Sequence, residues 1–194
     1  MDRRVEKTRV AIFNAFQNLL MKKSYPKITV QDIIDDANIG RSTFYAHFET
    51  KDALLYALCT DMFQHIFSRD LEEEETHDFS LLEGEPIPMM THILYHLKDN
   101  KKLLPGILKG EGANLFWDYF SIYFQEFIQD YLLTNLSSEI KDLPLDFIQQ
   151  QITGSFIELI KWWLQREMND SPEKIILYYQ KINTFFQMEN SNKK

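Results

Sequence analysis

The sequence contains few of the residues that interrupt helices or cross-link a chain. Of its 194 residues one is cysteine, and glycine and proline number six each. The single Cys59 excludes an intramolecular disulfide and a cluster of thiolate metal ligands. The small number of Gly and Pro residues argues against hairpin-rich folds, whereas 14% aromatic residues supply ample apolar surface for a core. The composition therefore favours an all-helical globular fold.

Long hydrophobic runs are also missing. No apolar segment approaches the 18 or so residues that a membrane-spanning helix requires. The N-terminal segment MDRRVEKTRV lacks the uninterrupted apolar stretch of a secretory signal. From these two absences we expect a protein of the cytoplasm that has no membrane partner.

Positive charge is scarce overall but unevenly distributed. The formal net charge is −8, yet residues 1–52 hold 9 Lys or Arg against 7 Asp or Glu, and the remainder holds 12 against 22. A local basic face can still bind a polyanion, because phosphate contacts act within about one Debye length, roughly 10 Å at moderate salt. The first quarter of the chain is the part suited to nucleic acid.

Apolar spacing predicts three short helices in this first quarter. The first covers residues 5–22, the second begins after Thr29 and reaches Ala37, and the third covers residues 41–48. The Thr29 hydroxyl can cap the second helix, with Asp32 in its first turn. Asn38 tolerates the left-handed backbone of a sharp turn, and Gly40 is an acceptable N-cap for the third helix.

The remaining sequence predicts further helices and a polar tail. Thr50 can cap the helix that follows it, Pro86 and Pro88 indicate a linker, and Glu72–Glu75 reads as a solvated segment. Ser171 and Pro172 suit the start of the last helix. The predicted helices are 51–68, 89–98, 103–109, 113–133, 145–169 and 172–188.

Two short helices joined by a tight turn predict a helix-turn-helix. No carboxylate lies between Gly40 and Phe48, so the third helix can face DNA. Arginine can read guanine bidentately, hydroxyl groups bond bases or phosphates, and tyrosine, histidine and lysine donate to phosphates. The candidates for these contacts are Arg41, Ser42, Thr43, Tyr45, His47 and, at the start of the following helix, Lys51.

These residues resemble those of the TetR family of bacterial transcription regulators from about Val10 to Leu58. The resemblance is carried by Ile28–Ile34, by Ala37–Phe48 and by Lys51–Leu55. The order Thr-Phe-Tyr-x-His-Phe, followed by Lys and then Leu-Leu, is far more specific than a bare helix-turn-helix pattern. The chain departs from the family pattern at Asn38, where glycine is usual, and at Gly40, where a hydroxyl or acidic residue is usual.

The resemblance implies a role for each matching residue. Base contacts are expected from Arg41, Ser42 and Gln31. Phosphate contacts are expected from Thr29, Thr43, Tyr45, His47 and Lys51. Together these imply a repressor that binds a double-stranded, palindromic DNA operator.

The resemblance also implies two domains, residues 1–50 for DNA binding and residues 51–194 for an effector and for dimerisation. The helix near Ile152–Leu164 is apolar over more than one face, which suits both a core and a partner subunit. We expect Phe156, Ile160, Trp163 and Ile182 at the interface of a homodimer. An unknown small-molecule effector, apolar or cationic, is expected against Trp117, Tyr123, Tyr95 and His92.

The alternatives are a small helical enzyme and a helical adaptor that has lost DNA binding. No phosphate-binding loop, nucleophile elbow or His-Glu-x-x-His motif supports catalysis, and an adaptor would not need an intact recognition helix. His92 and His96 have the i, i+4 spacing of metal ligands but lack a third ligand. We therefore expect no metal, no cofactor and no enzymatic activity.

Overall fold

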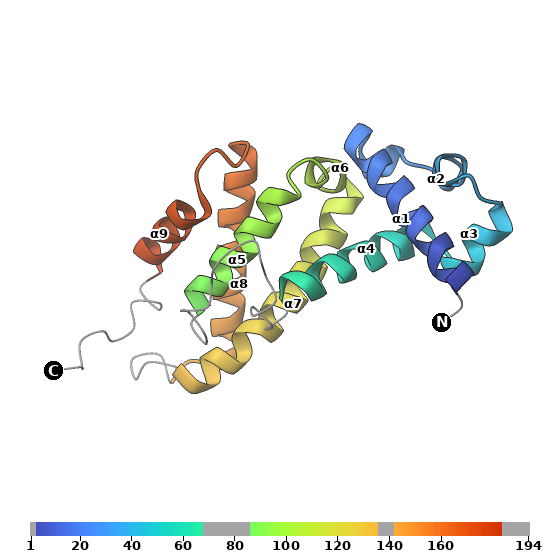
Figure 1. Cartoon of the computed structure of the whole chain (residues 1–194). Helices are drawn as coiled ribbons and strands as arrows, with labels where there is room; N and C mark the ends of the chain where they lie inside the picture. Colours follow the sequence, from blue (N-terminus) through green and yellow to red (C-terminus); the bar gives the residue numbers. More distant parts are fainter. Residues whose placement is uncertain (1–2, 68–85, 136–141, 184–194) are drawn as a thin grey trace. The chain divides into compact units, whose positions relative to one another are not determined.

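The computed structural model describes residues 3–67, 86–135 and 142–183, and these ranges contain helices and no strand (Figure 1). The prediction of an all-helical fold with an N-terminal helix-turn-helix and a larger helical region is confirmed. The described helices are α1 (Arg3–Lys22), the 3-10 helix η1 (Tyr25–Lys27), α2 (Val30–Ala37), α3 (Arg41–His47), α4 (Lys51–Ile66), α5 (Pro86–Asp99), α6 (Leu104–Ile107), α7 (Glu111–Asn135), α8 (Leu145–Gln165) and α9 (Pro172–Ile182).

The chain divides into two compact units. The first comprises residues 1–65 and 99–120, and the second comprises residues 66–98 and 121–194. The sequence suggested a boundary between residues 50 and 51, whereas nearly all of α4 and the first part of α7 belong to the first unit.

The first unit has a core built from the apolar faces of its short helices. Ile12, Phe16 and Leu20 are buried along α1, where the spacing of four residues puts them on one face. Phe44, on the inner face of α3, is buried, and the ring of Phe13 meets the ring of Phe48 edge-on with 5.7 Å between the ring centres. These contacts fix α3 against α1 and leave its opposite face in solvent.

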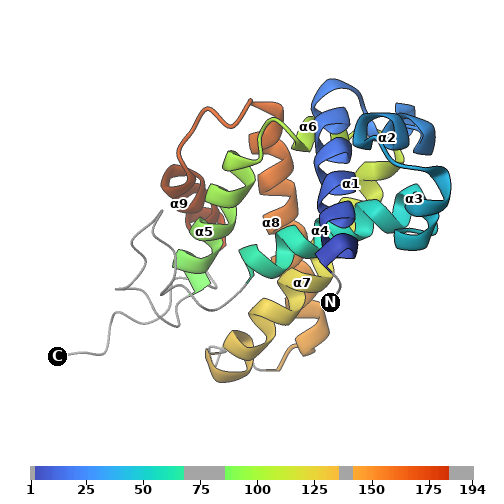
Figure 2. The same cartoon turned by 45° about the vertical axis from the view of Figure 1, so that its right-hand side comes forward.

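Helix α6 approaches α1 very closely at Gly106. Figures 1 and 2 both show α6 beside the end of α1 that leads into η1. A Cβ atom at position 106 would overlap the backbone carbonyl of Leu20. Glycine is therefore required at position 106, because any side chain there would force α6 away from α1.

The second unit is held together by aromatic packing among α7, α8 and α9. The rings of Phe124 and Phe156 stack at 4.8 Å, and Tyr179 meets Phe156 edge-on at 5.5 Å. The Tyr179 hydroxyl donates to the Ile152 carbonyl at 3.1 Å, and the Trp163 indole donates to the Asp170 carbonyl at 3.1 Å. Both polar atoms are thus satisfied inside an apolar core.

Several helix ends differ from the prediction, and two of them, the start of α5 and the end of α8, have a clear local cause. Helix α5 begins at Pro86 and not at 89, because the first turn of a helix tolerates residues that lack an N–H. Helix α8 ends at Gln165 and not at 169, since Glu167 and Met168 adopt positive φ values of 57° and 52°. The predictions for Glu72–Glu75 and for residues 184–188 lie outside the described residues.

Within the described ranges, none of the helices combines the length and the apolar character that crossing a membrane would require.

We predict that Gly106→Ala lowers the free energy of unfolding by about 1–3 kcal/mol, because the new methyl group overpacks a backbone contact. Gly40→Ala is the matched control: Gly40 has φ −78°, and a Cβ there would meet its nearest side-chain atom at 3.6 Å. The control should stay within about 1 kcal/mol of the parent. Urea unfolding followed by circular dichroism measures both, and equal stability of the two variants would contradict the close approach.

Candidate nucleic-acid interface

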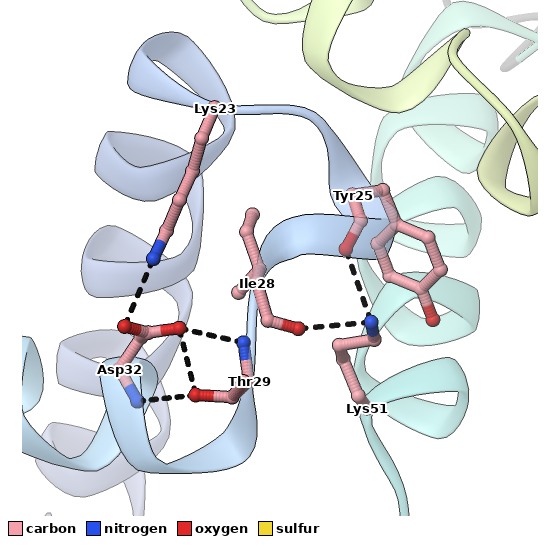
Figure 3. A network of polar contacts seen from close by, with 6 residues as sticks. All are labelled: Lys23, Tyr25, Ile28, Thr29, Asp32 and Lys51. Atoms are coloured by element: carbon pink, nitrogen blue, oxygen red, sulfur yellow. Dashed lines mark hydrogen bonds and ion pairs between the residues drawn. The ribbon is translucent and has the colours of Figure 1, made fainter.

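Helix α2 begins at a reciprocal cap made by Thr29 and Asp32 (Figure 3). The Asp32 backbone N–H donates to Thr29 Oγ1 at 3.1 Å, and the Thr29 N–H donates to Asp32 Oδ2 at 2.7 Å. The Lys23 ammonium lies 2.9 Å from Asp32 Oδ1 and ties this cap to the end of α1. These contacts hold the pKa of Asp32 well below its usual range, with the hydrogen bond from Lys23 as the largest cause.

Lys51, at the start of α4, is held by the segment that precedes α2. Its ammonium donates to the carbonyl oxygens of Tyr25 at 3.0 Å and Ile28 at 2.9 Å (Figure 3), and lies 4.1 Å from the centre of the Tyr25 ring. Partial burial lowers the pKa of Lys51. Lys51 was predicted as a phosphate contact; the structure shows a structural role, in which carbonyl oxygens take two of its three N–H donors.

The turn between α2 and α3 accommodates both departures from the family pattern. Asn38 adopts a left-handed conformation with φ 51° and ψ 51°, which asparagine tolerates better than most residues. Gly40 occupies the N-cap of α3 without a side-chain bond, and its carbonyl accepts from the Phe44 N–H at 3.1 Å. The expected turn and N-cap are confirmed.

Helix α3 turns Phe44 inward and presents polar residues to solvent. Arg41, Ser42 and Tyr45 are all exposed, and the Arg41 guanidinium carbon lies 5.8 Å from the centre of the Tyr45 ring. A guanidinium placed over a ring is oriented without losing its donors. The exposed face of α3 therefore offers hydrogen-bond donors and one positive charge, with no carboxylate from residue 40 to residue 48.

The other predicted contact residues are less free. Thr43 and His47 are half-buried on α3. The Thr29 hydroxyl donates to Asp32 Oδ2 at 2.7 Å, so the cap of α2 already uses this donor. The Gln31 amide, exposed on α2, donates to Asp35 at 2.8 Å. A DNA contact by Thr29 or Gln31 would compete with these internal bonds.

Arg9 is a candidate that the sequence reasoning missed. Its guanidinium carbon lies 5.3 Å from the centre of the Phe13 ring, and Phe13 packs against Phe48 at the end of α3. This chain of contacts brings a cation beside the recognition helix from a distant part of the sequence. The cluster of Arg3, Arg4, Lys7 and Arg9 was the available signal, but it does not reveal which cation approaches α3.

The predicted effector residues fall in both units. Trp117 belongs to the first unit, half-buried, and meets Phe116 and Phe120 edge-on. In the second unit Tyr123 stacks on Phe67, and the Tyr95 hydroxyl donates to Glu173, which raises the pKa of Tyr95 to about 12. The fourth, His92, is buried with its ring 4.3 Å from that of His96. Across the described part of the chain, no three His, Cys, Asp or Glu residues converge as metal ligands would.

The predicted dimer residues lie mostly inside one subunit. Phe156, Ile160 and Trp163 are 0% exposed, so their side chains form the core of a single chain and cannot reach a partner. Ile182 is 78% exposed. The prediction therefore chose the wrong side of α8 for the dimer interface. The apolar stripe packs inside the subunit, whereas Trp162, next to it in the sequence, is 38% exposed.

A capped helix, a tight turn and a second helix with an exposed cationic face define a helix-turn-helix protein. A family model described as bacterial regulatory proteins of the tetR family matches residues 12–58. A second model, described as a transcriptional regulator C-terminal region, matches residues 84–184. The chain belongs to the TetR family of DNA-binding transcriptional regulators.

Known proteins agree with this assignment. A TetR transcriptional regulator from Streptococcus agalactiae is 34% identical, with a TM-score of 0.74 over 93% of this chain and 96% of that one. A TetR-family regulator structure from Syntrophomonas wolfei shares the fold at 18% identity, with a TM-score of 0.69 over 97% and 99% of the two chains. The HTH-type transcriptional regulator YxbF of Bacillus subtilis is 38% identical over 90 residues, which are 44% of this chain and 23% of that protein.

We predict that Asp32→Asn lowers the melting temperature at pH 7, and that its difference from the parent shrinks as the pH falls from about 4 towards 2. The folded state lowers the pKa of Asp32 below the ordinary 3.8, so its contribution is present above that value and is lost as acid protonates the carboxylate. Asp36→Asn, an exposed residue of the same helix, is the control and should show no such convergence. A constant difference for Asp32→Asn across this range would contradict the assignment.

Proposed function

We propose that the protein is a homodimeric, ligand-responsive repressor that binds a palindromic DNA operator in the cytoplasm. The observation that carries this proposal is the exposed, carboxylate-free face of α3, held in a fixed position by the caps of α2 and by Phe44. Membership of the TetR family supports it independently. A regulator needs such a face twice, once for each half of a symmetric site.

In the proposed complex α3 enters the major groove with its N-terminal end towards the base edges. Arg41 and Ser42 contact bases, and Gln31 joins them when it releases Asp35. Phosphate contacts come from the other predicted residues of the interface, which position the helix without reading sequence. These are Thr29, Thr43, Tyr45, His47 and Lys51, to which we add Arg9.

A second copy of the chain is the partner proposed for the exposed apolar surface of α8 and α9. This α8–α9 surface consists of Phe147, Trp162, Leu177, Tyr178 and Ile182, none of which is buried in the subunit. The rings of Trp162 and Tyr178 meet edge-on at 6.2 Å, which joins the two helices into one surface. Aromatic residues and arginine are enriched at subunit interfaces. Arg166 fits this pattern, because its guanidinium carbon lies 4.9 Å from the centre of the Trp162 ring.

Ligand response is proposed for the region between Met89 and Tyr131, which carries Trp117, Tyr123, Tyr95 and His92. An effector that binds one arrangement of the dimer more tightly than another would shift the separation of the two α3 helices. The two helices must stand about 34 Å apart to reach successive major grooves. A coupling of 1–3 kcal/mol would change operator affinity roughly five- to 150-fold.

We predict that Arg41→Ala relaxes discrimination at one base pair per half-site by about 1–3 kcal/mol. Tyr45→Phe is the matched variant: it keeps the ring beneath Arg41 and removes only the hydroxyl, so it should weaken all DNA sequences alike. Fluorescence anisotropy with an operator selected from random duplexes, and with its shuffled sequence, measures both variants at several salt concentrations. The roles would be refuted if the two variants lowered the affinities for operator and shuffled DNA in the same ratio.

We predict that Trp162→Glu combined with Ile182→Glu weakens dimerisation at least tenfold without unfolding the chain, because both side chains are exposed in the subunit. Ile122→Glu, which alters an apolar residue 52% exposed on α7, is the control and should leave the dimer intact. Trp163→Glu should instead lower the stability of the fold, since Trp163 is buried. Analytical ultracentrifugation with circular dichroism separates these effects, and an unchanged dimer in the double variant would exclude the α8–α9 surface.

A further inference from the structure

The first unit contains an open pocket of about 310 Å³ where the end of α1 meets η1 and α6. Its floor is the close contact between Gly106 and the backbone of Leu20, so the two helices cannot approach further and fill it. Leu20, Met21 and Pro105 contribute apolar wall. The rest of the lining is Lys22, Lys23, Ser24, Lys27, Lys102 and Lys109.

The charge of this pocket is of one sign. Five of its ten lining residues are lysines, and none is Asp or Glu. Lys23 is neutralised by Asp32 at 2.9 Å. For the other four lysines the described residues provide no ion pair, and Lys22, Lys27, Lys102 and Lys109 are all exposed. Several like charges around one cavity, in a chain whose net charge is −8, create a local potential that attracts anions.

Helix stabilisation explains only part of this arrangement. Lys22 and Lys23 follow the ordinary preference for cations at the C-terminal end of a helix, here α1. Lys27 lies in η1, and Lys102 and Lys109 flank α6 more than 70 residues later. The same preference extends to Lys27 in the last turn of η1 and to Lys109 after the end of α6, but not to Lys102, which precedes the N-terminal end of α6. The fold thus brings cations from two distant segments to one pocket.

We propose that this pocket binds a small polyanion that carries two or more phosphate groups. The volume is at the lower end of the roughly 300–1,000 Å³ of small-molecule sites, and ammonium groups from two segments can bind separate phosphates as point charges. The apolar wall can hold an organic part between them. A bound polyanion would tie α6 to the end of α1.

The pocket lining contains none of the residues proposed to contact DNA and none of the four proposed effector residues, although Lys102 and Lys109 fall within the span from Met89 to Tyr131 and Lys23 pairs with Asp32 of the α2 cap. Phe48, the C-cap of α3, contacts Phe13 of α1, whereas the pocket lies at Leu20 and beyond, about 10 Å further along α1 at 1.5 Å per residue. A concave pocket of this size fits a small ligand and not the continuous backbone of a duplex. The alternative, that these lysines touch DNA phosphates, is separated by experiment.

Isothermal titration of the full chain with inorganic tripolyphosphate, at constant ionic strength and without DNA, tests the proposal. Lys102→Gln should weaken binding several-fold, and Lys102→Gln with Lys109→Gln at least tenfold. Lys101→Gln is the matched control, because it removes the same charge at the adjacent exposed residue, which does not line the pocket. Inorganic phosphate, with a single group, should bind at least tenfold more weakly than tripolyphosphate.

Three results would overturn the proposal. The first is no measurable tripolyphosphate binding by the parent protein. The second is equal weakening by Lys101→Gln and Lys102→Gln, which would indicate general charge attraction. The third is loss of affinity for a random duplex in the Lys102→Gln and Lys109→Gln variant with tripolyphosphate binding unchanged, which would assign these lysines to DNA. Operator binding by the variants is a separate measurement, so failure here leaves the regulator function standing.

Discussion

The fully buried side chain of Tyr25 is the point on which the DNA-binding unit depends. Its ring meets Phe16 of α1 edge-on at 6.2 Å and lies beneath the Lys51 ammonium of α4, while its hydroxyl donates to Asp52. Burial and that carboxylate raise the pKa of Tyr25, so the phenol stays protonated and remains a donor. A Cβ on Gly112 would reach 3.0 Å from the Tyr25 ring, which shows how tightly α7 closes over it. One side chain thus joins three helices of the unit, and only two residues, Ile28 and Thr29, separate η1 from α2.

This junction explains why α3 can be so short and yet point in one direction. A helix of seven residues is not stable alone, because few backbone hydrogen bonds offset the cost of nucleation. Its position is imposed by its neighbours: the cap at Thr29 fixes where α2 begins, the left-handed Asn38 fixes the turn, and Phe44 anchors the inner face. The exposed residues Arg41 and Tyr45 then need no ordering of the backbone when DNA arrives, which preserves binding free energy.

Local chemistry made the first fifty residues predictable. Caps, turns and periodic apolar positions act over three or four residues, so the sequence revealed Thr29, Asn38 and the bounds of α2 and α3. Assignments that depend on distant contacts were less secure. The stripe of Phe156 and Trp163 is apolar whether it meets its own subunit or another, and only the packing of Tyr179 and Phe124 against Phe156 shows which. The convergence of Lys27 with Lys102 was equally hidden, because the contact of α6 with α1 depends on the close approach at Gly106 and on no local pattern.

The distribution of charge follows from the same geometry. A net charge of −8 disfavours approach to DNA at long range, so DNA binding must rely on the local excess of cations in residues 1–52. Two of these cations already make internal contacts: Lys51 donates to backbone carbonyl oxygens, and Lys23 forms an ion pair with Asp32. Arg41 is the one Lys or Arg of α3, and the base contact that we propose is therefore assigned to it. Its guanidinium lies over the Tyr45 ring and keeps all five donors, so the residue that we propose reads a base already has a ring contact that orients it before DNA binds.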